Sequence, residues 1–300
     1  MDDLLLGLDL GTTRCKAVLV DGAGTEVAAA TAWTPFREGG GGVEMPVGDL
    51  LATVSYLTRS LGDGARRAAS VGIAAMAECG AALDRSGESL APIIAWHDLR
   101  GTDIAEQLQQ LFGDPLALRT GQRPRPVSTI AKLGWLVAHG FGPVDGWLGV
   151  AELCVRDLTG MAATEYSFAS RTGCYDVIEG VWLGEVARAA GFSVSVFAPV
   201  RAAGSAMGWV LPGAAGRWGL PPGIPVTLAG HDHLAGMLGA GAGAGDLVNS
   251  VGTAETVLGS SPLPPDMPKA VDLRVAISRA PGGTAWAAMT GATRAGLVLE

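Results

Sequence analysis

The sequence predicts an α/β fold built on a mixed β-sheet, and three observations lead to this expectation. First, two apolar runs of strand length flank the polar turn Gly11-Thr12-Thr13, as in a β-hairpin. Second, the elements that follow are expected in the order strand, strand, strand, helix, strand, strand, which favours a mixed sheet with a crossover helix. Third, the plan of strand, Gly-Thr turn and strand returns near Gly252-Thr253.

The first part of the chain supplies most of the predicted sheet. A hairpin is expected over 4–21, a third strand over 26–33, and short apolar strands over 70–75 and 80–83. Between the third and fourth strands, apolar residues recur at helical spacing after Pro46, which predicts a helix over 47–61.

The middle of the chain is predicted to be largely helical. Helices are expected over 102–112, 129–139, 147–158 and 182–190, with short strands between 165 and 176. Ser128 suits the N-cap of the second of these helices, and Gly140 suits its end. A stretch rich in Gly and Pro from 204 to 225 is expected to lead into a second domain.

The last part restarts the plan of the first. A strand is expected over 225–229, then a helix of small residues to Gly239, and then strands over 246–251, 255–258, 271–277 and 284–289. With 300 residues, 48% of them hydrophobic, the chain can bury the cores of one or two domains.

Composition restricts the function classes. The formal net charge is −8 and no long basic run is present, so nucleic acid is not an expected partner. No apolar run reaches the length of a membrane span, and the N-terminus lacks the pattern of a signal peptide. The four cysteines are far apart and lack metal-ligand spacing. Reduced thiols and a cytoplasmic location are therefore expected.

The first turn has the chemistry of a phosphate site. Gly11 allows close approach of the backbone, and Thr12 and Thr13 add short hydroxyl donors. Asp9, at the end of the first strand, could hold a hydrated Mg²⁺ beside phosphate oxygens. Two such turns facing each other would hold a nucleoside triphosphate, and no Walker motif is present. An ordinary hairpin with a polar tip is the alternative.

Asp232 is the candidate general base. It follows a predicted buried strand at the point where a helix begins, and a carboxylate there could accept the proton of an attacking hydroxyl in phosphoryl transfer. Helix N-capping is the competing interpretation. The triplet His231-Asp232-His233 also suggests a metal site, but no further His/Cys cluster supports zinc.

Several motifs, in order along most of the chain, resemble the FGGY carbohydrate kinases, which share the actin/hexokinase-like ATPase fold. They include GLDLGTTRCKAVLVD, SVGIAAMAECGAALDRSGESLAPIIAWHDLRG, TGQRPRPVSTIAKLGWL, TEYSFASRTGCYDV and AGHDHLAGMLGAGAGAGDLVNSVGTAETV. The resemblance implies a ribonuclease H-like/actin-like ATPase domain with a mixed five-stranded sheet, followed by the start of a second similar domain. The expected domains are 1–222, binding sugar and the first phosphate motif, and 223–300, a partial nucleotide-binding domain.

The resemblance also implies roles for individual residues. Asp232 would be the general base that activates a sugar or polyol hydroxyl for phosphorylation by ATP, and Asp9 would hold Mg²⁺ through water. The phosphate-binding set would be Gly11, Thr12, Thr13, Lys16, Gly252 and Thr253. The substrate-binding set would be Met76, Ala77, Glu78, Asp98 and His233. The expected partners are thus ATP and a small sugar or polyol, with a homodimer left open.

The sequence departs from the family pattern at positions expected to set substrate specificity, and in its length. Ala77 stands where glycerol kinases have arginine and xylulokinase-like members have histidine, and Val127 stands where glycerol kinases have tyrosine. These differences argue against glycerol and do not favour xylulose. Arg14 and Glu255 occupy positions that are usually small. Family members are also usually much longer, so a non-catalytic module that binds sugar or a partner is the main alternative. An acyl-phosphate kinase or phosphatase of the same superfold is a weaker one.

Overall fold

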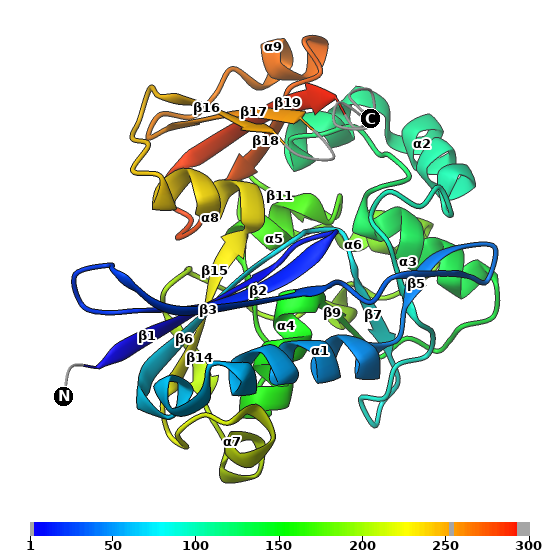
Figure 1. Ribbon diagram of the computed structural model, residues 1–300. Helices are drawn as coiled ribbons and strands as arrows, with labels where there is room; N and C mark the ends of the chain where they lie inside the picture. Colours follow the sequence, from blue (N-terminus) through cyan, green and yellow to red (C-terminus); the bar gives the residue numbers. More distant parts are fainter. Residues whose placement is uncertain (1–2, 252–254, 293–300) are drawn as a thin grey trace.

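The computed structural model describes residues 3–251 and 255–292. Its larger sheet has six strands in the order β14-β15-β6-β1-β2-β3 (Figure 1). The strands span Leu4–Leu10 (β1), Arg14–Val20 (β2), Glu26–Trp33 (β3), Ala68–Ala75 (β6), Ala206–Trp209 (β14) and Pro225–His231 (β15). Strand β1 is antiparallel to β2 and parallel to β6, and β15 is parallel to β6. The predicted mixed sheet is confirmed.

The predicted strand count of five is wrong, because β14 forms the sixth strand, on the edge beside β15. Its sequence, Ala-Met-Gly-Trp, lies inside the Gly- and Pro-rich stretch and shows no alternation of apolar and polar residues. The stretch predicted as a link between domains is therefore largely part of the first sheet and of the short helix α7 (Pro212–Trp218).

One face of the large sheet holds the main core. Leu4, Leu6, Leu8 and Leu10 alternate along β1 and are all buried on this face. Helix α1 (Val47–Ser60) packs Leu50, Val54 and Leu57 into the same core, and α4 (Val150–Thr159) packs beside it. Residues of β1 with the opposite parity, among them Gly7 and Asp9, point to the other face, as the two-residue period of a strand requires.

Parts of the segment between β3 and β14 form a second apolar cluster next to this core. Apart from β6, the strands of this segment are Arg37–Gly39 (β4), Gly42–Met45 (β5), Gly80–Leu83 (β7), Ile93–Ile94 (β8), Gly146–Gly149 (β9), Thr164–Glu165 (β10), Tyr175–Asp176 (β11), Val181–Trp182 (β12) and Val200–Arg201 (β13). Besides α1 and α4, its helices are Thr102–Thr120 (α2), Thr129–Ala138 (α3), Tyr166–Arg171 (α5) and Gly184–Ala189 (α6), with 3₁₀ turns at Gly62–Arg67 and Val194–Val196.

A second sheet is built from the last part of the chain and lies at the top of Figure 1. Its order is β16-β17-β19-β18, and all three pairings are antiparallel. The strands span Leu247–Val251 (β16), Glu255–Ser261 (β17), Ala276–Arg279 (β18) and Trp286–Ala292 (β19). Helix α8 (Asp232–Gly239) packs against β17, and helix α9 (Met267–Asp272) packs against β18. Strand β15 runs from the large sheet toward this one (Figure 1).

Four predicted elements differ from the structure. The stretch 165–176, expected to hold short strands, forms helix α5 between the two-residue strands β10 and β11. The helix expected over 147–158 begins only at Val150, because 146–149 form β9 and pair with β7, a strand distant in sequence. The helix expected to stop at Phe112 resumes after a break at Gly113 (φ 57°, ψ −149°), where Pro115 fits the first turn of the continuation. The strand expected over 271–277 is partly helical, since Asp266 caps α9 by accepting a hydrogen bond from the Lys269 N–H.

No helix in the described ranges 3–251 and 255–292 is long and apolar enough to cross a membrane.

The start of α4 contains a buried carboxylate. Glu152 accepts a hydrogen bond from the Gly149 N–H, and its side chain also bonds Thr164. Burial raises the pKa of Glu152 to about 7, and the nearby Glu165 adds to the rise. Between the ordinary carboxyl pKa and 7 the folded state therefore holds more protons than the unfolded state, so this group's contribution to stability falls as pH rises.

We expect Glu152→Gln to remove this pH dependence. The variant should match the wild type near pH 4.5 and exceed it above pH 7 by up to about 3 kcal/mol in free energy of unfolding, since the amide keeps the acceptor without the charge. Urea unfolding at several pH values measures this difference. Taking the difference between the two proteins cancels the titration of other groups. A difference that does not change with pH would contradict the assignment.

Candidate active site

A cavity of about 340 Å³ lies between the two sheets. Seven residues that the sequence marked as candidates line it together: Thr12, Thr13, Met76, Ala77, Glu78, Asp232 and His233. They come from the β1–β2 turn, the end of β6, and the junction of β15 with α8. The fold thus gathers a hydroxyl-bearing turn, a buried carboxylate and a partly exposed carboxylate around one space.

Asp232 is the first residue of α8, and its side chain is 25% exposed. Its Oδ1 accepts a hydrogen bond from the His233 N–H at 2.7 Å. The residue in the N-cap position is His231, and no side chain there caps the helix. Asp232 is therefore not an N-cap, and its carboxylate reaches the cavity as a proton acceptor would need to do.

His231 lies beside Asp232, and from the sequence it was considered only as part of a possible metal site. Burial, followed by the charge of Arg171, lowers the pKa of His231 to about 3, so its ring is neutral at physiological pH. Its Nε2 lies 3.3 Å from Asp232 Oδ1, and its Nδ1 has no hydrogen-bond partner among the described residues. We assign the tautomer with hydrogen on Nε2, since this ring then orients the Asp232 carboxylate without protonating it.

The backbone before Asp232 is held by a buried hydroxyl. Ser167 Oγ accepts a hydrogen bond from the His231 N–H at 2.9 Å and donates one to Glu165 Oε2 at 2.5 Å. Gly230 has φ 102°, and a Cβ there would lie 2.8 Å from Ser167 Oγ. A glycine is therefore required before His231, because only a residue without a side chain fits this approach.

Glu78 forms a buried ion pair with Arg171 at the base of the cavity. Both residues are less than 10% exposed. Glu78 also has φ 61°, which is unusual for a residue other than glycine. Such strain persists where surrounding contacts fix a side chain, and here it aims the carboxylate at Arg171. Arg171, on α5, was missed from the sequence because its partner lies far earlier in the chain.

The opposite wall of the cavity comes from the second sheet. His233 Nδ1 lies 3.0 Å from Ser250 Oγ on β16, so the residue after Asp232 connects α8 with that sheet. Glu255, on β17, also lines the cavity, and its Oε1 accepts a hydrogen bond from Asn249 Nδ2 at 2.9 Å. The predicted second phosphate turn, Gly252 and Thr253, lies outside the described residues.

The first predicted phosphate turn is held firmly. The Gly11 N–H donates to the Arg14 carbonyl at 3.1 Å, and Thr34 bonds both Gly11 and Thr13 through their carbonyls. Trp96 Nε1 donates to Thr12 Oγ1 at 2.7 Å. The turn is thus connected to the wall of the cavity that carries Trp96.

Asp9 and Lys16 lie elsewhere, on the face of the large sheet opposite to its core. They form an ion pair at 2.9 Å and line a second concave surface of about 610 Å³. Mg²⁺ usually keeps several waters and takes one or two carboxylates together with substrate phosphates. Asp9 fits this use, since its side chain is 39% exposed and one carboxylate oxygen has no ion pair among the described residues. No group of three potential metal ligands occurs in those residues.

Comparison with known proteins decides the family. The model of the FGGY family of carbohydrate kinases, N-terminal domain, matches residues 4–239. The chain belongs to the FGGY family of carbohydrate kinases. An L-fuculokinase of Salmonella typhi is 29% identical over 266 residues, which are 85% of this chain and 56% of that protein. A xylulose kinase of Klebsiella pneumoniae is 31% identical over 259 residues, which are 83% of this chain and 53% of that protein.

Solved structures show the same fold. The xylulose kinase from Rhodospirillum rubrum has a TM-score of 0.90 and 26% identity, and the match covers 99% of this chain and 62% of that one. The ligand-bound xylulose kinase from Lactobacillus acidophilus has a TM-score of 0.89 and 21% identity, with 99% and 61% covered. The predicted actin/hexokinase-like fold is confirmed. The chain spans about half the length of the curated relatives it matches.

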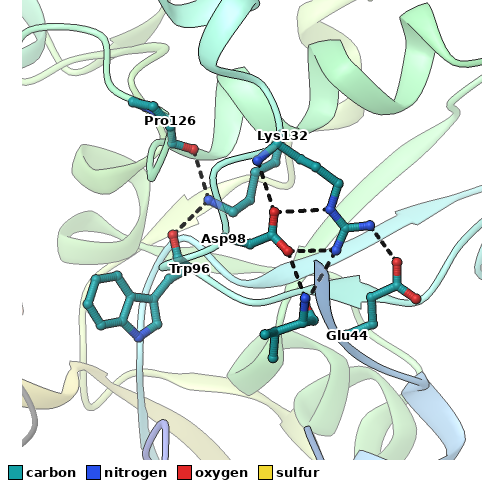
Figure 2. Close-up of polar contacts among 7 residues, drawn as sticks. Glu44, Trp96, Asp98, Pro126 and Lys132 are labelled. Atoms are coloured by element: carbon teal, nitrogen blue, oxygen red, sulfur yellow. Dashed lines mark hydrogen bonds and ion pairs between the residues drawn. The ribbon is translucent and has the colours of Figure 1, made fainter. Parts of the chain in front are cut away.

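Asp98, expected to bind substrate in this FGGY chain, does not line the cavity. Both of its carboxylate oxygens accept hydrogen bonds from Arg100, and Oδ2 also accepts the Val43 N–H at 2.8 Å. Arg100 in turn contacts Glu44 of β5 (Figure 2). Asp98 therefore joins the β5 strand to the segment that follows Trp96.

A buried lysine fixes the same wall. The Lys132 ammonium donates to the carbonyls of Trp96 and Pro126, both at 2.9 Å (Figure 2), and to that of Val127 at 3.1 Å. Burial lowers the pKa of Lys132 to about 8. By bonding both segments, Lys132 sets the distance between Trp96 and the 125–127 loop, which face the cavity together.

Proposed function

We propose that this chain carries the catalytic base and the sugar-binding wall of an ATP-dependent carbohydrate kinase. The observation that supports this most is the shared cavity of Asp232, Glu78 and the Thr12-Thr13 turn in a chain of the FGGY family. A phosphoryl transfer needs an acceptor for the hydroxyl proton and donors for the phosphate, and these groups are the two required kinds.

In the proposed reaction, a hydroxyl of the substrate gives its proton to Asp232 as its oxygen attacks the γ-phosphorus of ATP. The new O–P bond forms while the bond to the ADP oxygen breaks. The Gly11, Thr12 and Thr13 turn would donate hydrogen bonds to phosphate oxygens, with Gly252 and Thr253 opposite. Outside the cavity but on the same hairpin, Asp9 would hold Mg²⁺ through water and its ion-pair partner Lys16 would add a positive charge. When bound, Mg²⁺ offsets the charge on the phosphates.

The domain boundary is best placed after α8. Strand β15 follows the boundary predicted at 222, yet it pairs with β6 in the large sheet. The family match also ends at 239. We therefore propose that the sugar-binding domain extends to about Gly239 and that the second, partial nucleotide-binding domain begins in the glycine-rich turn after it.

Glu255 supports a second candidate, a module that binds sugar without turnover. Its carboxylate lines the cavity near the expected triphosphate and has no cationic partner among the described residues. A negative charge there would repel phosphate. This candidate predicts sugar binding with no effect of nucleotide.

A screen for sugar-dependent ADP release tests the proposal. Ketoses, aldoses, polyols and sugar acids are each incubated with the chain, ATP and Mg²⁺, and ADP is measured by a coupled assay. At least one acceptor should release ADP well above the rate with ATP alone. Calorimetry of the same acceptors separates the outcomes, because binding with no ADP release would favour the module and reject the kinase.

A further inference from the structure

Two arginines that line the cavity make no ion pair among the described residues. Three arginines line it: Arg125, Arg171 and, from the turn between α9 and β18, Arg274. Arg171 is paired with Glu78. The remaining acidic groups of the lining, Asp232 and Glu255, make no ion pair with Arg125 or Arg274 among the described residues.

Arg125 is the most informative of the three. It lies in the loop before α3, and its exposed side chain lines the cavity. Its Nη2 donates a hydrogen bond to the neutral Gln122 Oε1 at 3.1 Å, and it makes no ion pair among the described residues. The surrounding protein and the charge of Arg171 lower the pKa of Arg125, whereas Glu78 raises it. The guanidinium is therefore close to a second cation and lacks an anion of its own.

Arg171 offers an independent observation. It is 9% exposed, and its Nε has no hydrogen-bond partner among the described residues, although its Nη2 contacts Glu78. A buried N–H of a charged group without an acceptor is costly, and such donors usually meet a ligand or water. Two guanidinium groups with free donors thus face one part of the cavity.

A neutral sugar would give the Arg125 guanidinium no ionic partner. When a neutral substrate displaces water from a cavity, an unpaired cation loses hydration and gains no charged partner in return. A carboxylate would instead accept charge-assisted hydrogen bonds from the planar guanidinium groups, often two at once. ATP is the other source of anionic oxygens, but its phosphates are expected at the Thr12-Thr13 turn.

We infer that the acceptor substrate carries a carboxylate bound by Arg125 and Arg171, so that this protein acts on sugar acids in preference to neutral sugars or polyols. The inference rests on the kinase function proposed above for the choice of acceptor. The loop that carries Arg125 is held in place by Lys132 through the Pro126 and Val127 carbonyls, so the guanidinium is presented on a fixed segment.

Calorimetry with matched ligand pairs tests this preference on the chain as it stands. The pairs are gluconate and glucitol, galactonate and galactitol, xylonate and xylitol, and glucuronate and glucose. At least one acid should bind about tenfold or more tightly than its neutral partner, as expected for charge-assisted hydrogen bonds. Arg125→Gln should reduce that ratio to near one. Arg85→Gln removes the same charge from an exposed turn and should leave the ratio unchanged.

Three results would overturn the inference. They are the absence of any acid that binds better than its partner, an unchanged ratio in Arg125→Gln, and a loss in that variant confined to binding of an ATP analogue. The last result would assign Arg125 to the nucleotide phosphates. A preference for an acid with no release of ADP would retain the inference and reject the kinase. Turnover of a neutral ketose without any preference for acids would retain the kinase and reject the inference.

Discussion

Replacing Asp232 by asparagine is expected to lower phosphoryl transfer by a factor of about 10²–10⁴ while the acceptor still binds. Asparagine keeps an oxygen that can accept the His233 N–H, so the start of α8 should be unchanged. It cannot take a proton from the attacking hydroxyl at neutral pH. The loss should therefore appear in kcat, with the Kd of the acceptor changed by less than about threefold.

Two measurements make this prediction specific to the base. The free energy of unfolding of Asp232→Asn should stay within about 1 kcal/mol of the wild type, because the side chain is partly exposed and its hydrogen bond is kept. Asp63→Asn, at a fully exposed site far from the cavity, provides the matched control. Retention of full turnover in Asp232→Asn would reject Asp232 as the base.

Breaking the Glu78–Arg171 pair should have the largest effect on stability. Arg171→Met leaves a carboxylate that is 8% exposed without its cation, and removal of one partner of a buried pair costs about 3–5 kcal/mol. For a protein of this size, that loss lowers Tm by roughly 10 °C. Urea unfolding and thermal melts measure the two quantities.

The double variant Glu78→Gln/Arg171→Met distinguishes the cost of an unpaired buried charge from the cost of lost packing. It should be less destabilised than Arg171→Met alone, because no unpaired charge remains buried. Arg217→Met breaks a pair with Asp157 in which the arginine is 56% exposed, and it should cost about 1 kcal/mol or less. Equal losses in Arg171→Met and Arg217→Met would contradict the buried pair.

Local patterns predicted the parts of the fold that local forces determine. The first hairpin and α1 were predicted because alternation and helical spacing are visible within a few residues. Strand β9 was taken for helix because its partner β7 is far away in sequence, and pairing with that strand decides its conformation. Helix α9 had a usable signal in Asp266 and the proline that follows Met267.

The candidate site shows the same difference between residues that local sequence patterns reveal and residues that only distant contacts reveal. Seven of the candidate residues do line one cavity, since they belong to motifs that the family resemblance marked. Ser167, Arg171 and Arg125 were missed because nothing near them in sequence reveals a role. Ser167 becomes informative only through the His231 N–H, and Arg171 only through Glu78. Such pairs join segments that are brought together by the sheet, so their chemistry is apparent only in three dimensions.

The two attachments of the β15–α8 junction have a mechanical consequence. On one side, Ser167 Oγ accepts a hydrogen bond from the His231 N–H. On the other side, His233 Nδ1 lies within hydrogen-bond distance of Ser250 Oγ in the second sheet. Asp232 lies between these anchors. We therefore expect a rotation of the second sheet against the first to move the Asp232 carboxylate relative to the Thr12-Thr13 turn. In the kinase proposed above, the position of the base would then depend on how far the two sheets close around the substrate.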